Sequence, residues 1–337
     1  MKALILATPP PAPLNQLVDN GMLRLCGVPA LEIQVDLLRR HGVREILLVL
    51  GRGSEAVEHH FGDGQRFGVR MASLCSRHVM PTLGDLRPAR RFLADTFLML
   101  TTSALVATDL RALIAEHHSV CAQASIALTN AADQSMESNL MVIEPALLGE
   151  LKPTIPLGDG AVLATELEDS GARLHKAHRP LNRLPLTSPA DYLQAHWQYL
   201  KQEWPNLRQN GGMPPPRLEC GLNVSIDPRR CRIEGPVQIA GGAEVQDGAH
   251  LIGPCHIGAG SLIETGACIE RSIVLPHVQV SRHAHLREAI TDGRLCIMAD
   301  GTTIELCRAD LGWLIGDRRE SVESRARAEQ RFLNHIG

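Results

Sequence analysis

The chain has 337 residues, 44% of them hydrophobic, and a formal net charge of -3 at pH 7, which together allow two packed domains. With only 2 Tyr, 3 Trp and 5 Phe, it is short of both the basic surface and the stacking side chains that a nucleic-acid partner requires. The first apolar run, residues 3–7, is too short for a signal peptide, and no run approaches the ~20 residues that cross a bilayer. We therefore expect a cytoplasmic protein that binds no nucleic acid and does not insert into a membrane.

Short apolar runs alternate with amphipathic stretches from residue 1 to about 200. This rhythm predicts a mixed, mostly parallel sheet covered by helices on both faces, a Rossmann-like α/β fold. The expected strands are residues 3–7, 45–50, 96–101 and 124–129. The expected helices are residues 30–41, 54–60, 67–71 and 109–117, and Asp109 is expected to cap the last of them.

After a Gly- and Pro-rich connector at residues 206–219, the period of the sequence changes to six. The inside positions are predicted to hold an aliphatic series: Ile233, Ile239, Val245, Leu251, Ile257, Ile263, Ile269 and Leu275. Four positions after these come small or apolar residues: Val237, Ala243, Ala249, Cys255, Ser261, Ala267 and Ile273. Such hexapeptide repeats are typical of a parallel β-helix, in which each repeat forms one face of a triangular coil. We expect the register to slip after Leu275, where Val278 and Val280 compete for the inside position.

These patterns divide the chain into four parts. Residues 1–205 form the α/β domain, 206–219 the linker, 220–310 the left-handed β-helix and 311–337 a C-terminal helical cap. A short solenoid cannot bury its own ends. We therefore expect the β-helix to be capped, or to pair with another chain.

Several motifs point to a known family. They are Met1-Lys-Ala-Leu-Ile-Leu-Ala7, Gly27-Val-Pro-Ala-Leu31, Phe61-Gly-Asp-Gly-Gln-Arg-Phe-Gly-Val69, Glu144-Pro145 and Ile269-Glu-Arg-Ser-Ile-Val-Leu-Pro276. In these the sequence resembles the sugar-nucleotide pyrophosphorylases with a C-terminal left-handed β-helix, most closely the mannose-1-phosphate guanylyltransferase-like group. The resemblance implies a nucleotidyltransferase domain that transfers a nucleotidyl group from a nucleoside triphosphate to a sugar 1-phosphate. It also implies a glycine-rich phosphate loop and two aspartates that hold Mg²⁺.

At the position of that family's glycine-rich phosphate loop, this chain has residues of a different type. At its position the chain reads Pro9-Pro10-Pro11-Ala12-Pro13. Proline has no N–H to donate and its φ is fixed, so Pro9, Pro11 and Pro13 cannot contribute to a nest of amides around a phosphate. The family's arginine in this loop is also missing.

The two metal-binding aspartates implied by the resemblance are missing as well. The first corresponds to Ser103, and the second to Pro185. Without two carboxylates a hard divalent cation has no protein anchor. We therefore predict a degenerate member of the family, with no catalytic residues, no bound metal and no cofactor.

Four residues remain as candidates for residual ligand binding. Arg24 is the cation nearest to the family's basic element, and Gly84, Asp85 and Arg87 occupy its second glycine turn, where Asp85 adds a negative charge. Arg87 offers a guanidinium that a phosphate could use.

Three functions are compatible with this reading. The first is a non-catalytic scaffold or regulatory subunit in sugar-nucleotide or polysaccharide biosynthesis. It would form a homo-oligomer, or a hetero-oligomer with an active homologue, through the β-helix, and a nucleotide sugar is its candidate ligand. The second is an active pyrophosphorylase with substituted site residues.

The third is a hexapeptide-repeat acyltransferase, whose candidate bases are His250, His256, His277, His283 and His285. An isolated histidine without an orienting partner is weak support for such a base. The pairs His59-His60 and His117-His118 fall near helix ends, but a metal would need a third ligand that the sequence does not reveal.

Overall fold

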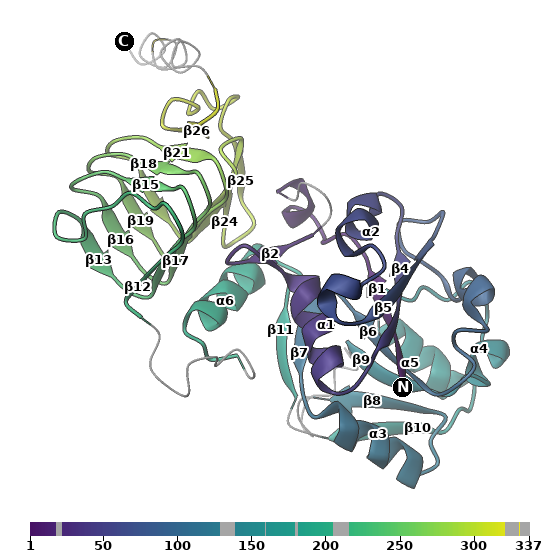
Figure 1. Cartoon of the computed structure of the whole chain (residues 1–337). Coiled ribbons are helices and arrows are strands. Elements are labelled where there is room, and N and C mark those ends of the chain that lie inside the picture. Colours follow the sequence, from purple (N-terminus) through teal and green to yellow (C-terminus); the bar gives the residue numbers. More distant parts are fainter. Residues whose placement is uncertain are drawn as a thin grey trace. The chain divides into compact units, whose positions relative to one another are not determined.

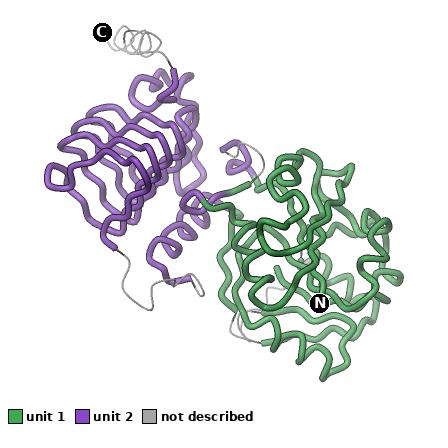
Figure 2. The backbone as a smooth tube through the Cα atoms, in the orientation of Figure 1, with its two compact units in different colours: residues 1–11, 18–23, 28–187 green, residues 12–17, 24–27, 188–337 purple. Residues whose placement is uncertain are grey.

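The computed structural model describes residues 1–17, 22–128, 139–158, 160–178, 181–204, 216–320 and 330. The chain forms two compact units, coloured separately in Figure 2. Unit 1 comprises residues 1–11, 18–23 and 28–187, and unit 2 comprises residues 12–17, 24–27 and 188–337. The predicted linker at 206–219 falls largely outside the described residues, so the division into four parts stays a prediction.

Unit 1 is built on one mixed sheet (Figure 1). Within the described residues its strand order is β10-β8-β9-β6-β1-β4-β5, and all neighbouring pairs are parallel except those that involve β9. The strands are β1 (Lys2–Ala7), β4 (Glu45–Leu50), β5 (Arg70–Cys75), β6 (Phe97–Thr101), β8 (Ala124–Leu128), β9 (Leu140–Ile143) and β10 (Leu174–His178). A separate antiparallel pair consists of β7 (Ala104–Ala107) and β11 (Asn182–Pro185). This is the Rossmann-like α/β domain that the alternating pattern predicts.

Helices lie on both faces of this sheet. They are α1 (Ala30–Arg40), α2 (Glu55–Phe61), α3 (Leu110–Ser119), α4 (Leu147–Glu150) and α5 (Gly160–Asp169), with 3-10 turns at Leu14–Gln16, Gln65–Phe67 and Leu83–Ala89. The short strands β2 (Arg24–Leu25) and β3 (Val28–Pro29) precede α1. Asp109 accepts hydrogen bonds from the N–H groups of Arg111 and Ala112, which confirms the predicted cap of α3.

The core of unit 1 has two halves because successive side chains of a strand face opposite sides. Ala3 and Ile5 of β1 pack with α1, α2 and α3, whereas Leu4 and Leu6 pack with the turn at Leu83–Ala89 and with α4 and α5. All four side chains are fully buried. A strand that is covered on both faces reads as a continuous apolar run, and this explains the sequence of β1.

The predicted helix at residues 67–71 is wrong. Phe67 ends a 3-10 turn that is flanked by Gly64 and Gly68, both with positive φ, and the chain then enters strand β5. Met71 pairs with Ile46 of β4. The left-handed glycines end the helical conformation, and the sheet edge provides the hydrogen bonds for a strand.

Unit 2 contains a left-handed parallel β-helix with three faces (Figure 1). Within the described residues, the first face is β12-β14-β17-β20-β23-β24-β25, the second β13-β16-β19-β22 and the third β15-β18-β21-β26. The strands of the first face are β12 (Leu218–Cys220), β14 (Val237–Ile239), β17 (Cys255–Ile257), β20 (Ile273–Val274), β23 (Ala289–Thr291), β24 (Leu295–Met298) and β25 (Thr303–Glu305). Those of the second are β13 (Arg232–Glu234), β16 (His250–Ile252), β19 (Cys268–Glu270) and β22 (His285–Arg287). Those of the third are β15 (Glu244–Val245), β18 (Leu262–Ile263), β21 (Val278–Val280) and β26 (Ile315–Asp317).

The inside positions of this β-helix agree with the six-residue period from Ile233 to Ile269, and all of these aliphatic side chains are buried. The assignment of Leu275 is wrong. Val274, not Leu275, pairs with Ile257 and is fully buried, whereas Leu275 is half-buried. The register therefore slips before Leu275. The corner there consists of one residue, Arg271, with φ of 47°, whereas the corresponding corner of the preceding coil has two residues, Gly253 and Pro254.

The last coils are followed by strands that run in the opposite direction. β24 is antiparallel to β23, β25 is antiparallel to β24, and β26 is antiparallel to β21. Of the predicted helical cap at 311–337, residues 311–320 contain β26, and the remainder lies outside the described residues apart from Gln330. No helix in the described ranges is long and apolar enough to span a bilayer.

Helix α6 (Pro189–Leu200) completes unit 2 and packs against β23 and β24. Ser188 caps it by accepting a hydrogen bond from the Asp191 N–H, and Pro189 occupies its first turn. The guanidinium of Arg271 lies 4.1 Å from the centroid of the Trp197 ring, a cation–π contact that joins the helix to the β-helix corner.

Candidate functional site

Four parallel strands of unit 1, β1, β4, β5 and β6, end at the same edge of the sheet. Open α/β sheets bind their ligands at this carboxyl edge. The loops after β1 and β6 are joined there, because the Thr8 N–H donates to Thr102 Oγ1 and Thr102 Oγ1 donates to the Thr8 carbonyl, both over 3.3 Å. The sequence places the candidate phosphate loop and Ser103 directly after these two threonines.

The first part of the proline loop, residues 9–11, follows β1 at this edge, and the whole loop has few amides to offer. Pro9 and Pro13 are half-buried, Pro11 is exposed, and the Pro9 ring faces Gly51, where an added Cβ would lie 3.6 Å from Pro9 Cδ. From residue 9 to residue 13 only Ala12 has a backbone N–H. A single amide cannot form the cluster of donors that binds a polyphosphate.

Ser103 and Pro185 lie side by side. Pro185 of β11 pairs with Ala104 of β7, and the Leu186 N–H donates to the Ser103 carbonyl over 2.8 Å. The two positions at which the resemblance implies metal-binding aspartates are thus brought together, although they are far apart in sequence. Their side chains are a hydroxyl and a pyrrolidine ring.

A polar cluster surrounds Ser103. Asn139 Nδ2 donates to Thr101 Oγ1 over 2.6 Å and to Ser103 Oγ over 2.7 Å, and the two hydroxyls are 3.1 Å apart. Arg183 Nε donates to Asn139 Oδ1 over 2.6 Å. These four residues provide neutral oxygens and one guanidinium, and none of them has the carboxylate that a hard cation prefers.

Sequence reasoning missed Arg183 in this cluster. It lies in β11 two residues before Pro185, so its side chain faces the same side of the strand as Pro185. Its position two residues before Pro185 in the same strand is the sequence signal from which it could have been found. The resemblance places the sugar-binding region between Asn130 and Ser135, which lies outside the described residues, and a sugar-contacting motif at Glu137-Ser-Asn139, of which only Asn139 is described.

Asp85 is part of a helix cap. Its Oδ2 accepts hydrogen bonds from the Thr82 N–H (2.8 Å), Thr82 Oγ1 (3.1 Å) and Ser76 Oγ (2.9 Å), and His78 Nδ1 lies 3.4 Å away. Partial burial alone would raise the pKa of Asp85, but these hydrogen bonds outweigh it and hold the pKa below its usual value. The carboxylate is therefore engaged within the turn at Leu83–Ala89.

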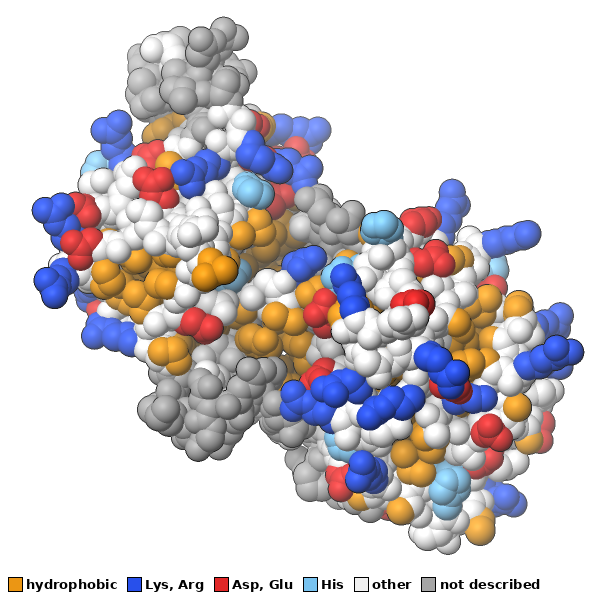
Figure 3. Space-filling view, in the orientation of Figure 1, with side chains coloured by type: hydrophobic (Ala, Val, Ile, Leu, Met, Phe, Trp, Pro, Cys, Tyr) orange, Lys and Arg blue, Asp and Glu red, His pale blue; other side chains and the backbone are white. Residues whose placement is uncertain are grey.

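The other residual candidates have separate surroundings. The Gly84 N–H donates to the Pro153 carbonyl over 2.8 Å, and Arg87 is exposed on the same turn as Asp85. Arg24 belongs to unit 2, where its Nη1 donates to the Gly27 carbonyl over 2.8 Å. On the face drawn in Figure 3 the basic and acidic side chains are intermingled.

The β-helix histidines lack a common arrangement. His256 is buried with Nδ1 3.0 Å from Gln238 Oε1, and His285 Nε2 lies 3.5 Å from Glu270 Oε2. His277 and His283 occupy corners with positive φ, and His250 is exposed. The five histidines share no single arrangement that would orient a base, so an acyltransfer base is not favoured at any of them.

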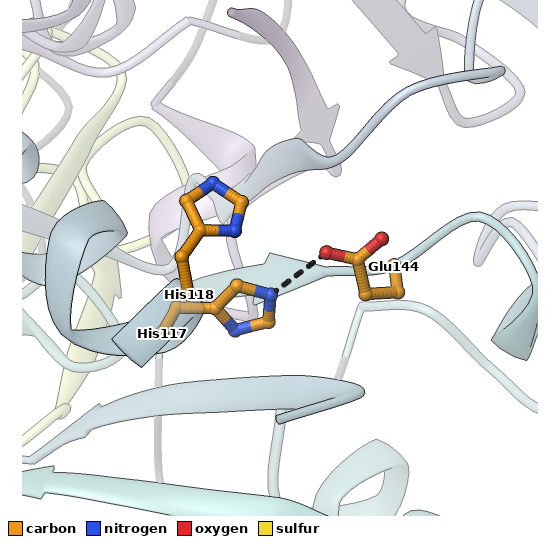
Figure 4. A group of neighbouring side chains, drawn as sticks. All are labelled: His117, His118 and Glu144. Carbon is orange, nitrogen blue, oxygen red and sulfur yellow. Dashed lines mark hydrogen bonds and ion pairs between the residues drawn. The ribbon is translucent and has the colours of Figure 1, made fainter. Parts of the chain in front are cut away.

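At the opposite, amino edge of the sheet in unit 1, His117 and His118 of α3 meet Glu144, which follows β9 (Figure 4). Among the described residues this is the one set of three His, Cys, Asp or Glu side chains whose donor atoms are close enough to share a metal ion. Glu144 is the third side chain that the sequence did not reveal, because only the fold brings the residue after β9 next to the end of α3.

A mixed sheet of mostly parallel strands, in a chain that continues into a hexapeptide β-helix, is the two-part architecture of a nucleotidyltransferase-like protein. A family model described as "GlmU-like, C-terminal hexapeptide" matches residues 227–308. A UTP–glucose-1-phosphate uridylyltransferase of Synechocystis sp. (strain ATCC 27184 / PCC 6803 / Kazusa) is 28% identical over 369 aligned residues, which cover 96% of this chain and 95% of the relative.

Two solved structures are also similar. A putative glucose-1-phosphate thymidylyltransferase from Bacillus anthracis, in complex with a sucrose, has a TM-score of 0.48 and 15% identity, covering 58% of this chain and 93% of its own. HddC from Yersinia pseudotuberculosis has a TM-score of 0.48 and 13% identity, covering 59% of this chain and 99% of its own. The chain is a sugar-nucleotide pyrophosphorylase-like protein.

Proposed function

We propose that this protein is a non-catalytic member of its class, a scaffold or regulatory subunit in sugar-nucleotide or polysaccharide biosynthesis in the cytoplasm. It would assemble through the β-helix, with itself or with an active homologue. The observation that carries the proposal is the pair Ser103 and Pro185, adjacent at the carboxyl edge and without a carboxylate in either side chain.

The chemistry explains why this pair matters. Nucleotidyl transfer builds up negative charge on the leaving pyrophosphate, and a metal ion contributes several kcal/mol to its stabilisation, a contribution of order ~10³-fold in rate or more. Mg²⁺ prefers carboxylate oxygens, and the polar cluster around Ser103 instead contains hydroxyls, one amide and the Arg183 guanidinium. The proline loop adds a second deficit, since it has one N–H where a phosphate needs several.

The test is an assay of the purified chain with Mg²⁺, each common nucleoside triphosphate and a panel of sugar 1-phosphates. We expect no pyrophosphate release above the background without enzyme. A known uridylyltransferase assayed in parallel shows that the conditions support turnover. Release of pyrophosphate that depends on both substrates would refute the proposal.

A second candidate is an active nucleotidyltransferase with substituted site residues. The alignment with a uridylyltransferase over 96% of the chain favours it, and the Arg183 guanidinium provides a positive charge at the site. If the same assay shows activity with UTP and glucose 1-phosphate, Arg183→Ala is expected to reduce kcat, and Arg183→Lys to restore part of it. If kcat is the same in the parent and in Arg183→Ala, Arg183 does not replace the missing site residues.

Residual ligand binding distinguishes a sensor from a pure scaffold. Of the proposed residues Arg24, Gly84, Asp85 and Arg87, Arg87 is the exposed cation of unit 1, whereas the Asp85 carboxylate is engaged in its turn. Isothermal titration with nucleotide sugars is the direct measurement. Binding that Arg87→Ala weakens supports a sensor, and absence of binding at millimolar ligand supports a scaffold.

A further inference from the structure

The amino edge of the sheet in unit 1 has a cluster of potential metal ligands that the resemblance does not assign. His117 and His118 are consecutive residues of α3, and Glu144 follows the antiparallel strand β9. One donor atom from each lies within 4.8 Å of the others. In Figure 4 the Glu144 carboxylate faces the two imidazole rings.

Two of the three ligands are already oriented by hydrogen bonds. His117 is buried, its Nδ1 lies 2.7 Å from Ser125 Oγ, and its Nε2 lies 3.1 Å from Glu144 Oε1. Thr96 Oγ1 donates to the same Glu144 oxygen over 2.7 Å. Metal-binding histidines are held in this way, with one ring nitrogen fixed by a protein oxygen and the other directed at the ion.

A bound cation would take the place of the hydrogen bond between His117 Nε2 and Glu144 Oε1, so the ion and this hydrogen bond exclude each other.

The donor set indicates which ion would bind. Two imidazole nitrogens and one carboxylate oxygen suit Zn²⁺ and similar divalent transition metals, rather than Mg²⁺ or Ca²⁺, which prefer oxygen ligands. With metal–ligand distances of about 2.0–2.2 Å, the donors must approach one another to about 3.3–3.5 Å. His118 is exposed at the end of α3, so its side chain can make this adjustment without disturbing the core.

We propose that His117, His118 and Glu144 form a binding site for a zinc-type divalent metal ion, which joins the end of α3 to the segment after β9. Three protein ligands leave one coordination position open to water or to an anionic ligand. The site shares no residue with the carboxyl edge, so it is independent of whether the protein catalyses nucleotidyl transfer.

The test is equilibrium dialysis of the full chain, free of any histidine tag, reduced and stripped with a chelator, against Zn²⁺ and then Co²⁺. We expect one equivalent of metal at micromolar free ion, and a Co²⁺ spectrum without the intense charge-transfer band of a thiolate ligand. Such a band would overturn the proposal, since it would assign the ion to a free cysteine. Binding of less than one equivalent at these concentrations would overturn it as well.

Variants locate the ion. His118→Ala removes an exposed ligand and is expected to keep the fold, and it should weaken Zn²⁺ binding at least tenfold. Glu144→Gln should have a similar effect. His59→Ala, at an exposed histidine of α2, is the matched control and should bind as the parent does. Binding that neither His118→Ala nor Glu144→Gln weakens would overturn the proposed site.

Discussion

The backbone N–H of Leu186 donates a 2.8 Å hydrogen bond to the carbonyl oxygen of Ser103, and this bond holds the end of β11 against the turn between β6 and β7. The backbones at positions 103 and 185 are therefore close to each other whatever side chains they carry. Two carboxylates introduced at these positions would both lie near this turn, and this makes the metal binding that the resemblance implies open to a direct test.

The double variant Ser103→Asp with Pro185→Asp is expected to gain a Mg²⁺-dependent stability. Without metal the two carboxylates repel each other, and we expect a loss of about 1–2 kcal/mol in the free energy of unfolding. Mg²⁺ should reverse this loss, because an ion that binds only the folded state stabilises it. Thermal unfolding with and without Mg²⁺ measures the effect, and Ser103→Asn with Pro185→Asn is the neutral control. Equal melting temperatures in both conditions would contradict the prediction.

Removal of the Asp85 carboxylate should destabilise unit 1. Asp85→Ala leaves the Thr82 N–H and the Ser76 hydroxyl without their acceptor, at an expected cost of about 1–2 kcal/mol. Arg87→Ala, on the same turn but exposed, should change stability by less than about 0.5 kcal/mol. Urea unfolding at pH 7 compares the two, and similar losses in both variants would contradict a capping role.

The same carboxylate predicts a pH dependence. The pKa of Asp85 is lower in the folded state than its ordinary value of 3.8, so its contribution is complete above that value and is lost as the pH falls through the folded pKa. Between pH 5 and pH 3 the parent should lose more stability than Asp85→Ala. Parallel slopes of stability against pH would show that Asp85 does not contribute.

Val274 and Leu275 should differ sharply despite being adjacent. Val274 is fully buried inside the β-helix, so Val274→Ala is expected to cost about 1.5–3 kcal/mol, including the cavity it leaves. Leu275 is half-buried, and Leu275→Ala should cost about 1 kcal/mol or less. Chemical unfolding of both variants measures the difference. The reverse order would support the uninterrupted six-residue period over the register described above.

Two buried histidines should make unit 2 sensitive to mild acid. Burial lowers the pKa of His196 to about 3, with a further effect of the neighbouring His256, and burial lowers the pKa of His256 to about 4. Both values lie below the ordinary 6.5, so the neutral rings contribute full stability above pH 6.5 and less as the pH falls below it. Each histidine should remove about 1.4 kcal/mol per pH unit. Unfolding at pH 7.0 and 5.5 tests this.

The control for that experiment is His250→Gln, an exposed position that should leave the slope unchanged. His196→Gln with His256→Gln should flatten the dependence on pH. If the double variant keeps the slope of the parent, other groups are responsible for the acid sensitivity.

Local patterns allowed much of the fold to be predicted. The cap at Asp109 and the buried positions from Ile233 to Ile269 depend on neighbours within a few residues, so the sequence shows them directly. Leu275 could not be placed in this way, because the period does not reveal that Arg271 alone turns a corner for which the coil before it uses two residues. The helix expected at 67–71 was wrong for a related reason, because after Gly68 the chain pairs with β4 as strand β5.

The candidate sites depended on contacts that the sequence does not show. The resemblance indicated Ser103 and Pro185 separately. Arg183 comes close to Ser103 only because β11 pairs with β7, and Asn139 only because β9 lies beside β6. Glu144 reaches His117 because β9 runs antiparallel to β6 and β8, which brings its end to the amino edge. Strand direction is a property of the whole sheet and cannot be inferred from one segment.

The reversed strands at the end of the β-helix limit how such molecules can stack. A parallel coil leaves an open rim on which another coil could continue the solenoid, and repeated stacking of that kind leads to fibres. On two faces the rim next to the last parallel coil is occupied by the antiparallel strands β24 and β26. On the third face the last described strand is β22, in which the side chains of His285 and Arg287 are exposed. A coil of a second molecule that continued the parallel solenoid at this end would therefore have to displace β24 and β26.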